Sequence, residues 1–193
     1  MIEYEKKILL TENEYRCLEM CMFFHTPKTV QTNYYYDTDD LYFNKNGTTC
    51  RIREIDGVYT ATVKKHGIGE DSASSEISVP AENKFDTRAF EGMVVSLKGV
   101  LTTERRETNN YRGAKVVIDR NTYLGTSDYE LEVEYEEGHE NDAMEAIEEV
   151  ERCLRVFKVL PYEVHLKDRI GKSKSKSKRF FQNLFNHDTT CHL

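Results

Sequence analysis

The stretch IEYEKK at residues 2–7 decides how the fold is interpreted, because carboxylates recur in it at every second position. Residues two apart in a β-strand share a face, so Glu3, Glu5 and Lys7 would line one side of a strand. A face that carries two carboxylates and an ammonium is costly to bury against an apolar core. It makes sense where that face meets metal ions and a polyanion. The stretch therefore predicts a strand with one functional, charged face.

The chain supplies seven further runs with strand-like alternation, which makes strands the dominant element. We expect strands at residues 2–10, 31–37, 48–55, 59–65, 75–79, 101–108, 114–123 and 129–136. Turn signals such as Asp56-Gly57 join several of them into hairpins. We expect helices at residues 11–24, 86–97, 140–157 and 178–185, the first with a capping box of Thr11 and Glu14. The pattern predicts one α+β domain over residues 1–193, built on an antiparallel sheet or barrel.

Four of these strands repeat the division into a charged and an apolar face. Three glutamates on one face repel each other unless cations lie opposite. Arginines two apart offer forked donors that suit phosphate oxygens. The charged sets are Arg51 and Arg53, then Thr62 and Lys64, then Thr103, Arg105 and Glu107, and finally Glu130, Glu132 and Glu134.

Two interpretations of the charged faces stay open at this point. They are either solvated outer faces of an ordinary sheet or the inner wall of a closed barrel whose apolar faces lie outward under the helices. A lumen that mixes acidic and basic side chains is electrostatically reasonable around a multivalent anion with metal ions.

The bulk composition narrows the class of protein. The 193 residues carry a net charge of −7, which argues against a general nucleic-acid binder. No apolar run approaches the roughly 18–20 residues that span a bilayer, and the charged beginning does not read as a signal peptide. The five cysteines are odd in number and form no CxxC pair, so free cytosolic thiols are the simplest interpretation. We expect a cytoplasmic protein without nucleic-acid or membrane partners.

Two local patterns offer competing functions. Cys17, Cys21 and His25 fall on one helical face and could bind zinc, but a fourth ligand is missing, and a helix core face explains them better. The basic run at residues 172–179 could bind nucleic acid or a membrane, although such runs are usually solvated. Residues 186–193 look like a frayed tail.

Nine short stretches carry a recognisable series of motifs. They are EYEKK at residues 3–7, NYYYDT at 33–38, CRIR at 50–53, TVK at 62–64, TER at 103–105, VID at 117–119, LG at 124–125, ELE at 130–132 and SKSKRF at 175–180. In this order along the chain, the motifs resemble the CYTH family of triphosphate tunnel metalloenzymes. The resemblance covers residues 3–180. The least typical part is residues 65–78, where the family usually carries an arginine near its glutamate and here only Glu76 stands out.

The resemblance implies a closed, eight-stranded antiparallel tunnel with helices outside, which binds a triphosphate with a divalent metal. Bacterial inorganic tripolyphosphatases are the most similar members, so hydrolysis of tripolyphosphate to pyrophosphate and phosphate is the leading hypothesis. A class IV adenylyl cyclase, a thiamine triphosphatase and a non-catalytic polyphosphate-binding module are the alternatives. The protein would act on a small molecule as a monomer or homodimer.

The resemblance also implies roles for individual residues. Glu5, Lys7 and Glu132 would be catalytic, and Glu76, Asp119 and Glu134 are secondary candidates. Mg²⁺ or Mn²⁺, which prefer oxygen ligands, would bind Glu3, Glu5, Glu130 and Glu132. The phosphate oxygens would bind Lys7, Arg51, Arg53, Lys64, Arg105 and Lys176.

Overall fold

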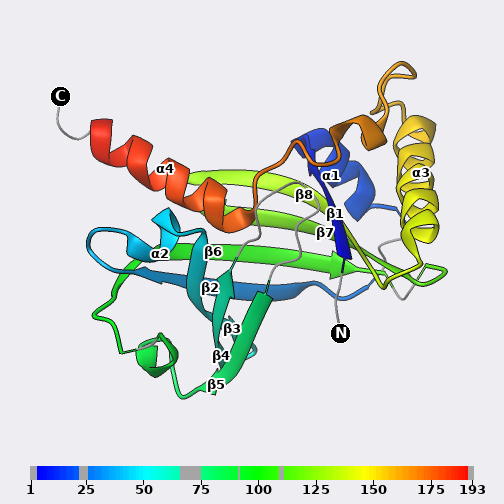
Figure 1. The fold of residues 1–193 in the computed structure, drawn as a ribbon. Helices are drawn as coiled ribbons and strands as arrows, with labels where there is room; N and C mark the ends of the chain where they lie inside the picture. The colour runs from blue at the N-terminus through cyan, green and yellow to red at the C-terminus, as the bar shows by residue number, and fades with distance from the viewer. Residues whose placement is uncertain (1–3, 22–25, 66–74, 91, 109–110, 191–193) are drawn as a thin grey trace. The chain divides into compact units, whose positions relative to one another are not determined.

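A computed structural model describes residues 4–21, 26–65, 75–90, 92–108 and 111–190, the last four of them as helical backbone only (Figure 1). Glu3 and His25 therefore lie outside the described residues. None of the described helices is long and apolar enough to cross a membrane.

Eight strands form one antiparallel sheet, which confirms the predicted α+β class (Figure 1). The order within the sheet is β1-β8-β7-β6-β2-β3-β4-β5. Between the two ends of this order, β1 and β5, no ladder is found among the described residues, so closure into a barrel stays a prediction. The strands are β1 (Tyr4–Leu10), β2 (Thr29–Asp37), β3 (Thr48–Ile55), β4 (Val58–Lys65), β5 (Ser75–Ala81), β6 (Ser96–Glu107), β7 (Ala114–Tyr123) and β8 (Thr126–Tyr135).

Within the described residues, four α-helices and two 3₁₀ turns accompany the sheet. The predicted capping box is confirmed, because Thr11 and Glu14 exchange side-chain and backbone hydrogen bonds at the start of the first helix. The last helix is longer than predicted, and the tail expected from residue 186 is helical as far as Thr190. The elements are α1 (Glu12–Glu19), α2 (Tyr42–Lys45), η2 (Thr87–Ala89), α3 (Glu140–Val156), η3 (Leu166–Arg169) and α4 (Lys176–Thr190).

The helix predicted at residues 86–97 is wrong. The described residues of this segment form the 3₁₀ turn η2 and no α-helix, and β6 begins at Ser96. Gly92 has a φ of +67°, which a right-handed helix does not allow. Phe90 is fully buried while Val94 is 90% exposed, so the apolar residues there do not form one helical stripe.

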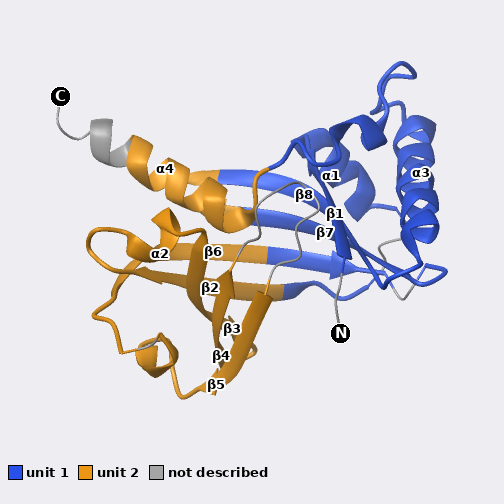
Figure 2. Cartoon of the chain, in the orientation of Figure 1, with its two compact units in different colours: residues 1–29, 104–121, 127–173 blue, residues 30–103, 122–126, 174–193 orange. Residues whose placement is uncertain are grey.

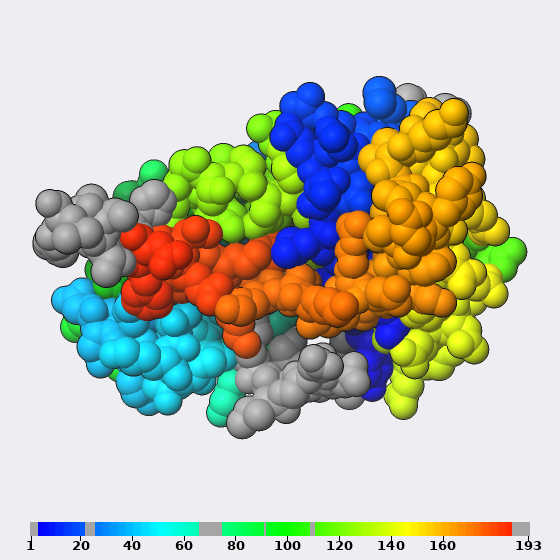
Figure 3. Space-filling model, turned by 90° about the horizontal axis from the view of Figure 1, so that it is seen from above, coloured from blue at the N-terminus to red at the C-terminus, as the bar shows by residue number. Residues whose placement is uncertain are grey.

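The chain divides into two compact units, shown in Figure 2. Residues 1–29, 104–121 and 127–173 form the first unit, and residues 30–103, 122–126 and 174–193 form the second. In the first unit the apolar sides of β1, β7 and β8 pack against α1 and α3, with Ile8, Ile118 and Leu131 fully buried. In Figure 3 the blue surface of α1 lies against the yellow and orange surface of α3 and the segment after it.

The second unit has two apolar clusters. One surrounds Ile52 and Phe90 on the apolar side of β3 and β4. The other contains Tyr35 of β2 together with Phe180 and Phe181 of α4, so α4 packs against the ring of Tyr35. Tyr35 pairs with Arg51 across β2 and β3 and therefore shares the charged face. Helix α4 thus lies on the charged side of this unit, whereas the prediction put the helices outside.

Asp37, at the end of β2, builds the short connection to β3. Its carboxylate accepts backbone hydrogen bonds from Thr38, Phe43 and Asn44 at 2.8–2.9 Å. These bonds satisfy donors of α2 and of the turn that precedes it. The aspartate in the NYYYDT stretch is 1% exposed and is a structural anchor in this fold.

Candidate functional site

In the first unit, the register of β1 and β8 creates a charged face. Glu5 lies opposite Glu134 and Lys7 opposite Glu132, while Ile8 and Leu131 face the core on the other side. The Lys7 ammonium lies 3.1 Å from a Glu5 oxygen and 3.3 Å from a Glu132 oxygen. The lysine therefore neutralises carboxylates of both strands.

Arg105 of β6 is the main cation of this face. Its Nε and Nη2 donate to the two oxygens of Asp119 on β7 at 2.9 and 2.6 Å, and Nη2 also donates to Glu132 at 2.6 Å. Burial lowers the pKa of the Arg105 guanidinium, but the hydrogen bond to Asp119 and the charges of Asp119, Glu132 and Glu134 outweigh it and raise that pKa. Arg105 therefore stays charged and fixes the carboxylates around it.

Three carboxylates of β7 and β8 form a buried acidic cluster beside this arginine. Asp119, Glu130 and Glu132 each place an oxygen within 4.8 Å of the others, and none is more than 4% exposed. Close carboxylates in a buried place repel strongly, and the cations Arg105 and Lys7, which contact this cluster, also pair with Glu134 and Glu5. An all-oxygen donor set of this kind fits Mg²⁺ or Mn²⁺.

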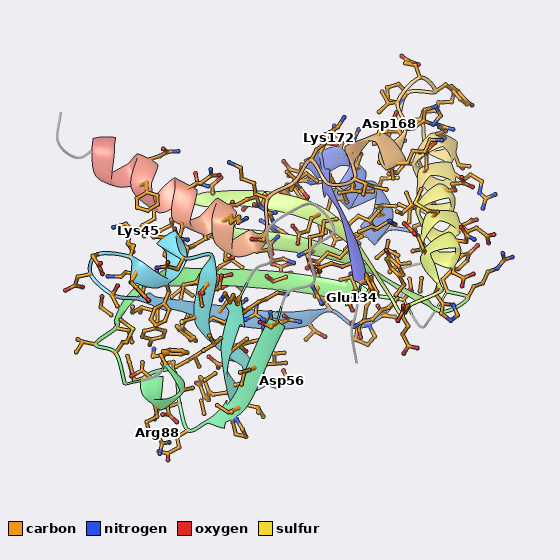
Figure 4. All side chains as sticks on the ribbon, viewed as in Figure 1. Lys45, Asp56, Arg88, Glu134, Asp168 and Lys172 are labelled. Atoms are coloured by element: carbon orange, nitrogen blue, oxygen red, sulfur yellow. The ribbon has the colours of Figure 1, made fainter. Side chains whose placement is uncertain are left out.

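Glu134, labelled in Figure 4, lies beside Arg105 and is not one of the three clustered carboxylates. It contacts Arg105 at 3.7 Å and the ammonium of Lys115 at 3.5 Å. Burial lowers the pKa of Lys115, but its hydrogen bond to Glu107 and the charge of Glu134 raise it overall. Sequence reasoning missed Lys115. It lies four residues before Asp119 on β7 and therefore on the same face of the strand, so the alternation of the strand could have identified it.

In the second unit, the registers of β2 to β5 align a basic face. Arg51 pairs with Tyr35 on one side and Thr62 on the other, and Thr62 pairs with Ser78. Arg53 lies two residues along the same face, opposite Asn33. The prediction that the arginines share a face with Thr62 and Lys64 agrees with this register.

The cations of the basic face have different partners. Arg53 donates from Nε to the amide oxygen of the buried Asn33 at 2.9 Å. Arg51 and Lys64 lie 3.5 and 3.6 Å from the two oxygens of Glu76. The Nε of Arg51 is buried and has no hydrogen-bond partner among the described residues. A buried guanidinium donor without a partner is the feature that a phosphate oxygen would satisfy.

Lys176 begins α4 and belongs to the same electrostatic environment. Burial raises the pKa of Tyr35, and the charges of Arg51, Lys176 and Arg53 oppose this shift. Ser177, next to Lys176, accepts a hydrogen bond from Thr49 of β3 at 3.0 Å, which ties the start of α4 to the basic face.

The predicted site residues thus fall into two groups. In the second unit Arg51, Lys64 and Glu76 are in contact, Arg53 is held by Asn33, and Lys176 lies at the start of α4. The first unit brings together Glu5, Lys7, Arg105, Asp119, Glu130, Glu132 and Glu134. Sequence reasoning ranked Asp119 as secondary, because it lies one strand away from the glutamates and only the β7–β8 pairing joins them.

The cysteines support the helix-core interpretation of their pattern. Cys17 and Cys21 are buried free thiols, and Cys17 belongs to the core between α1 and the sheet. Burial raises the pKa of Cys17. His25, the third member of the suggested zinc site, lies outside the described residues.

A family model described as the CYTH domain matches residues 1–160. The chain belongs to the CYTH family. Among curated CYTH relatives, "Putative triphosphatase YjbK" of Bacillus subtilis is 29% identical over 154 residues, which are 72% of this chain and 80% of that protein.

Solved structures agree with the CYTH fold. One, described as "a putative adenylate cyclase" from Bacillus halodurans, superposes with a TM-score of 0.62 at 23% identity, and the match covers 93% of this chain and 97% of that chain. Another, HpAC1 from Hippeastrum, also has a TM-score of 0.62, at 18% identity, and covers 86% of this chain and 100% of its own. At these identities the likeness concerns the fold alone.

Proposed function

We propose that this CYTH protein is a divalent-metal-dependent enzyme that hydrolyses a triphosphate, with inorganic tripolyphosphate as substrate and pyrophosphate and phosphate as products. The observation that carries the proposal is the buried cluster of Asp119, Glu130 and Glu132 next to Arg105. Buried carboxylates beside a fixed guanidinium suit a metal bound to an anionic phosphate better than a purely structural core.

The curated relative supports the same class of reaction. The Bacillus subtilis protein carries a triphosphatase name, and it shares 29% of residues with this chain over most of its length.

Asp119, Glu130 and Glu132 would hold Mg²⁺ or Mn²⁺, together with Glu5 of β1 and with Glu3, which precedes β1 in the sequence. A bound divalent ion would supply charge neutralisation at the phosphate oxygens and an activated water for attack. Glu134 is assigned to the edge of this site, where Lys115 holds it. Arg105 would keep the carboxylates in position and donate to a phosphate oxygen through the remaining part of its fork.

The phosphate groups are assigned to the cations of both charged faces. The buried Nε of Arg51 has no hydrogen-bond partner among the described residues, so it would be available to donate to a phosphate oxygen. Phosphoryl transfer needs little covalent chemistry from the protein, so these residues would act by positioning and charge stabilisation. The assigned residues are Lys7, Arg51, Arg53, Lys64, Arg105 and Lys176.

The proposal also includes the wider expectations from the sequence. The eight strands would close as the tunnel of the family, in one catalytic domain over residues 1–193. The enzyme would be cytoplasmic and would act as a monomer or homodimer on a small-molecule substrate.

A substrate panel tests the proposal. The protein is incubated with tripolyphosphate, ATP or thiamine triphosphate in Mg²⁺ or Mn²⁺, and orthophosphate, pyrophosphate and cyclic AMP are measured. We expect metal-dependent release of phosphate and pyrophosphate, fastest from tripolyphosphate. Cyclic AMP from ATP as the main product would replace the hydrolase with a cyclase, and turnover of none of the three would overturn the enzyme assignment.

A further inference from the structure

Glu76 lies between two of the cations assigned to phosphate. Its Oε1 is 3.5 Å from Nη2 of Arg51, and its Oε2 is 3.6 Å from Nζ of Lys64. The β4–β5 register places Glu76 directly opposite Lys64, so the contact is built into the pairing of the strands. Ser78, two residues along the same face, donates to Oε1 at 3.3 Å. One carboxylate therefore occupies the space between both cations.

The contacts of Glu76 are those of a weakly held counter-ion. Charge-assisted N–H···O bonds are normally about 2.7–2.9 Å long, so neither cation is at full hydrogen-bonding distance. The Glu76 side chain is 36% exposed, whereas that of Arg51 is 16% exposed. Arg51 also keeps its buried Nε without a partner among the described residues. The Glu76 carboxylate therefore balances the positive charges of Arg51 and Lys64 without forming short hydrogen bonds to their N–H donors.

A phosphate group matches the same cations better than Glu76 does. It carries more negative charge than one carboxylate and has three oxygens, enough to accept from Nη2 and Nε of Arg51 and from Lys64 together. Removing Glu76 alone would leave two neighbouring cations with unbalanced repulsion.

We propose that Glu76 is an internal counter-anion which occupies the phosphate position of Arg51 and Lys64 and which an incoming phosphate group displaces. The inference rests on the proposed phosphate-binding role of these cations. It makes Glu76 a determinant of affinity, because an incoming phosphate group must displace the carboxylate before it binds Arg51 and Lys64.

The test measures binding without turnover. Tripolyphosphate is titrated calorimetrically into the full-length protein in EDTA, for the wild type, Glu76→Gln and Glu82→Gln. Glu82 lies in the same unit, is exposed and pairs with Arg88 (labelled in Figure 4), so its substitution removes one charge away from the basic face. We expect Glu76→Gln to lower the Kd about 3- to 10-fold, the effect of removing two partly exposed ion pairs, and Glu82→Gln to change it less than about twofold.

A double substitution locates the effect. In a background of Arg51→Gln and Lys64→Gln, the gain from Glu76→Gln should disappear, because the competing cations are gone. A gain that persists there would overturn the inference, since it would reflect net charge alone. Glu76→Ala removes the same carboxylate and serves as the test if Glu76→Gln does not fold.

Unchanged or weaker binding of tripolyphosphate by Glu76→Gln would overturn the proposed counter-anion role of Glu76. A wild type that binds no tripolyphosphate would also overturn it. The hydrolase proposal is judged separately, by phosphate release with metal. If Glu76→Gln binds tripolyphosphate more tightly but the protein hydrolyses none of the triphosphates, the counter-anion role of Glu76 is supported and the proposed hydrolase activity is overturned.

Discussion

Arg105 shows how far single residues of the site can be predicted. Strand parity puts it on the charged side of β6 and puts Arg106 on the other side, where Arg106 donates to the carbonyl of Thr26. Parity does not reveal that Arg105 holds Asp119 and Glu132, because those contacts depend on which strands become neighbours. The sequence thus identifies the face of each side chain but not its partner.

Replacing Arg105 by lysine should damage both stability and turnover. A lysine cannot reach both oxygens of Asp119 and also Glu132, so buried carboxylates lose charge-assisted hydrogen bonds. We expect Arg105→Lys to reduce the free energy of unfolding by about 2 kcal/mol. We expect the rate of tripolyphosphate hydrolysis to fall about 100-fold. Urea denaturation and phosphate release measure the two effects.

Arg106→Lys is the matched control, because Arg106 is on the same strand but on the opposite face. Its unfolding free energy should change by less than about 1 kcal/mol, with normal turnover. Equal losses in both variants would show that Arg105 has no special role.

At the scale of elements, the sequence predicts the strands, through their period-two alternation, better than it predicts the helices. The strands β3 and β7 have the predicted bounds, and α3 begins where predicted. The error at residues 86–97 arises because Phe90 is fully buried in the core of the second unit, while Val94, about one helical turn further along the sequence, is 90% exposed. Tertiary packing of one aromatic ring decides that segment, and local propensity does not contain it.

Helix α2 is another element that the sequence hides. It has four residues, too few for a periodic signal, and Leu41 before it adopts a left-handed φ of 61°. Its backbone donors depend on Asp37, which lies five residues before the helix begins. The element exists because of a side chain outside it.

Asp37→Ala should therefore destabilise the protein without removing its chemistry. Three backbone donors lose their acceptor, and we expect a loss of about 1–2 kcal/mol in the free energy of unfolding. Asp39→Ala is the control, since Asp39 is exposed and contacts only Ser96 and Lys98 among the described residues. A purely structural role for Asp37 would be contradicted if kcat fell by a larger factor than the fraction of folded protein does.

At the scale of the whole molecule, the division into charged and apolar faces is readable from the sequence, and the strand order is not. The order β8-β7-β6 brings Glu132, Asp119 and Arg105 together from strands that are consecutive in the chain. By contrast, β6 neighbours β2, a non-local pairing that no local pattern specifies. The fold class and the charged face of each strand are thus predictable, while the geometry of the candidate site needs the structure.

The tyrosines predict how stability changes with pH. Burial raises the pKa of Tyr15, Tyr35, Tyr36 and Tyr59, and burial with a hydrogen bond to Glu54 raises that of Tyr34 to about 12. The folded state therefore favours the neutral phenols, so their contribution is complete below the unfolded pKa of about 10 and is lost as pH rises above it.

We expect the urea midpoint to decrease steadily from about pH 9.5, just below the unfolded pKa of the phenols, to about pH 11.5. Absorbance at 295 nm should show phenols that ionise only on unfolding. The decrease should be smaller in Tyr34→Phe, which keeps the ring and removes the hydroxyl that donates to Glu54. A midpoint independent of pH over this range would be inconsistent with the buried tyrosines.

The central claim is that Asp119, Glu130 and Glu132 form a site for a divalent metal, and Mn²⁺ binding followed by electron paramagnetic resonance tests it most directly. The wild type should bind Mn²⁺, and Glu130→Gln, which keeps the shape of the buried side chain, should bind at least about tenfold more weakly. Glu145→Gln on the exposed side of α3 should bind as the wild type does. Equal Mn²⁺ affinity in the wild type and Glu130→Gln, or no binding to either, would contradict the claim.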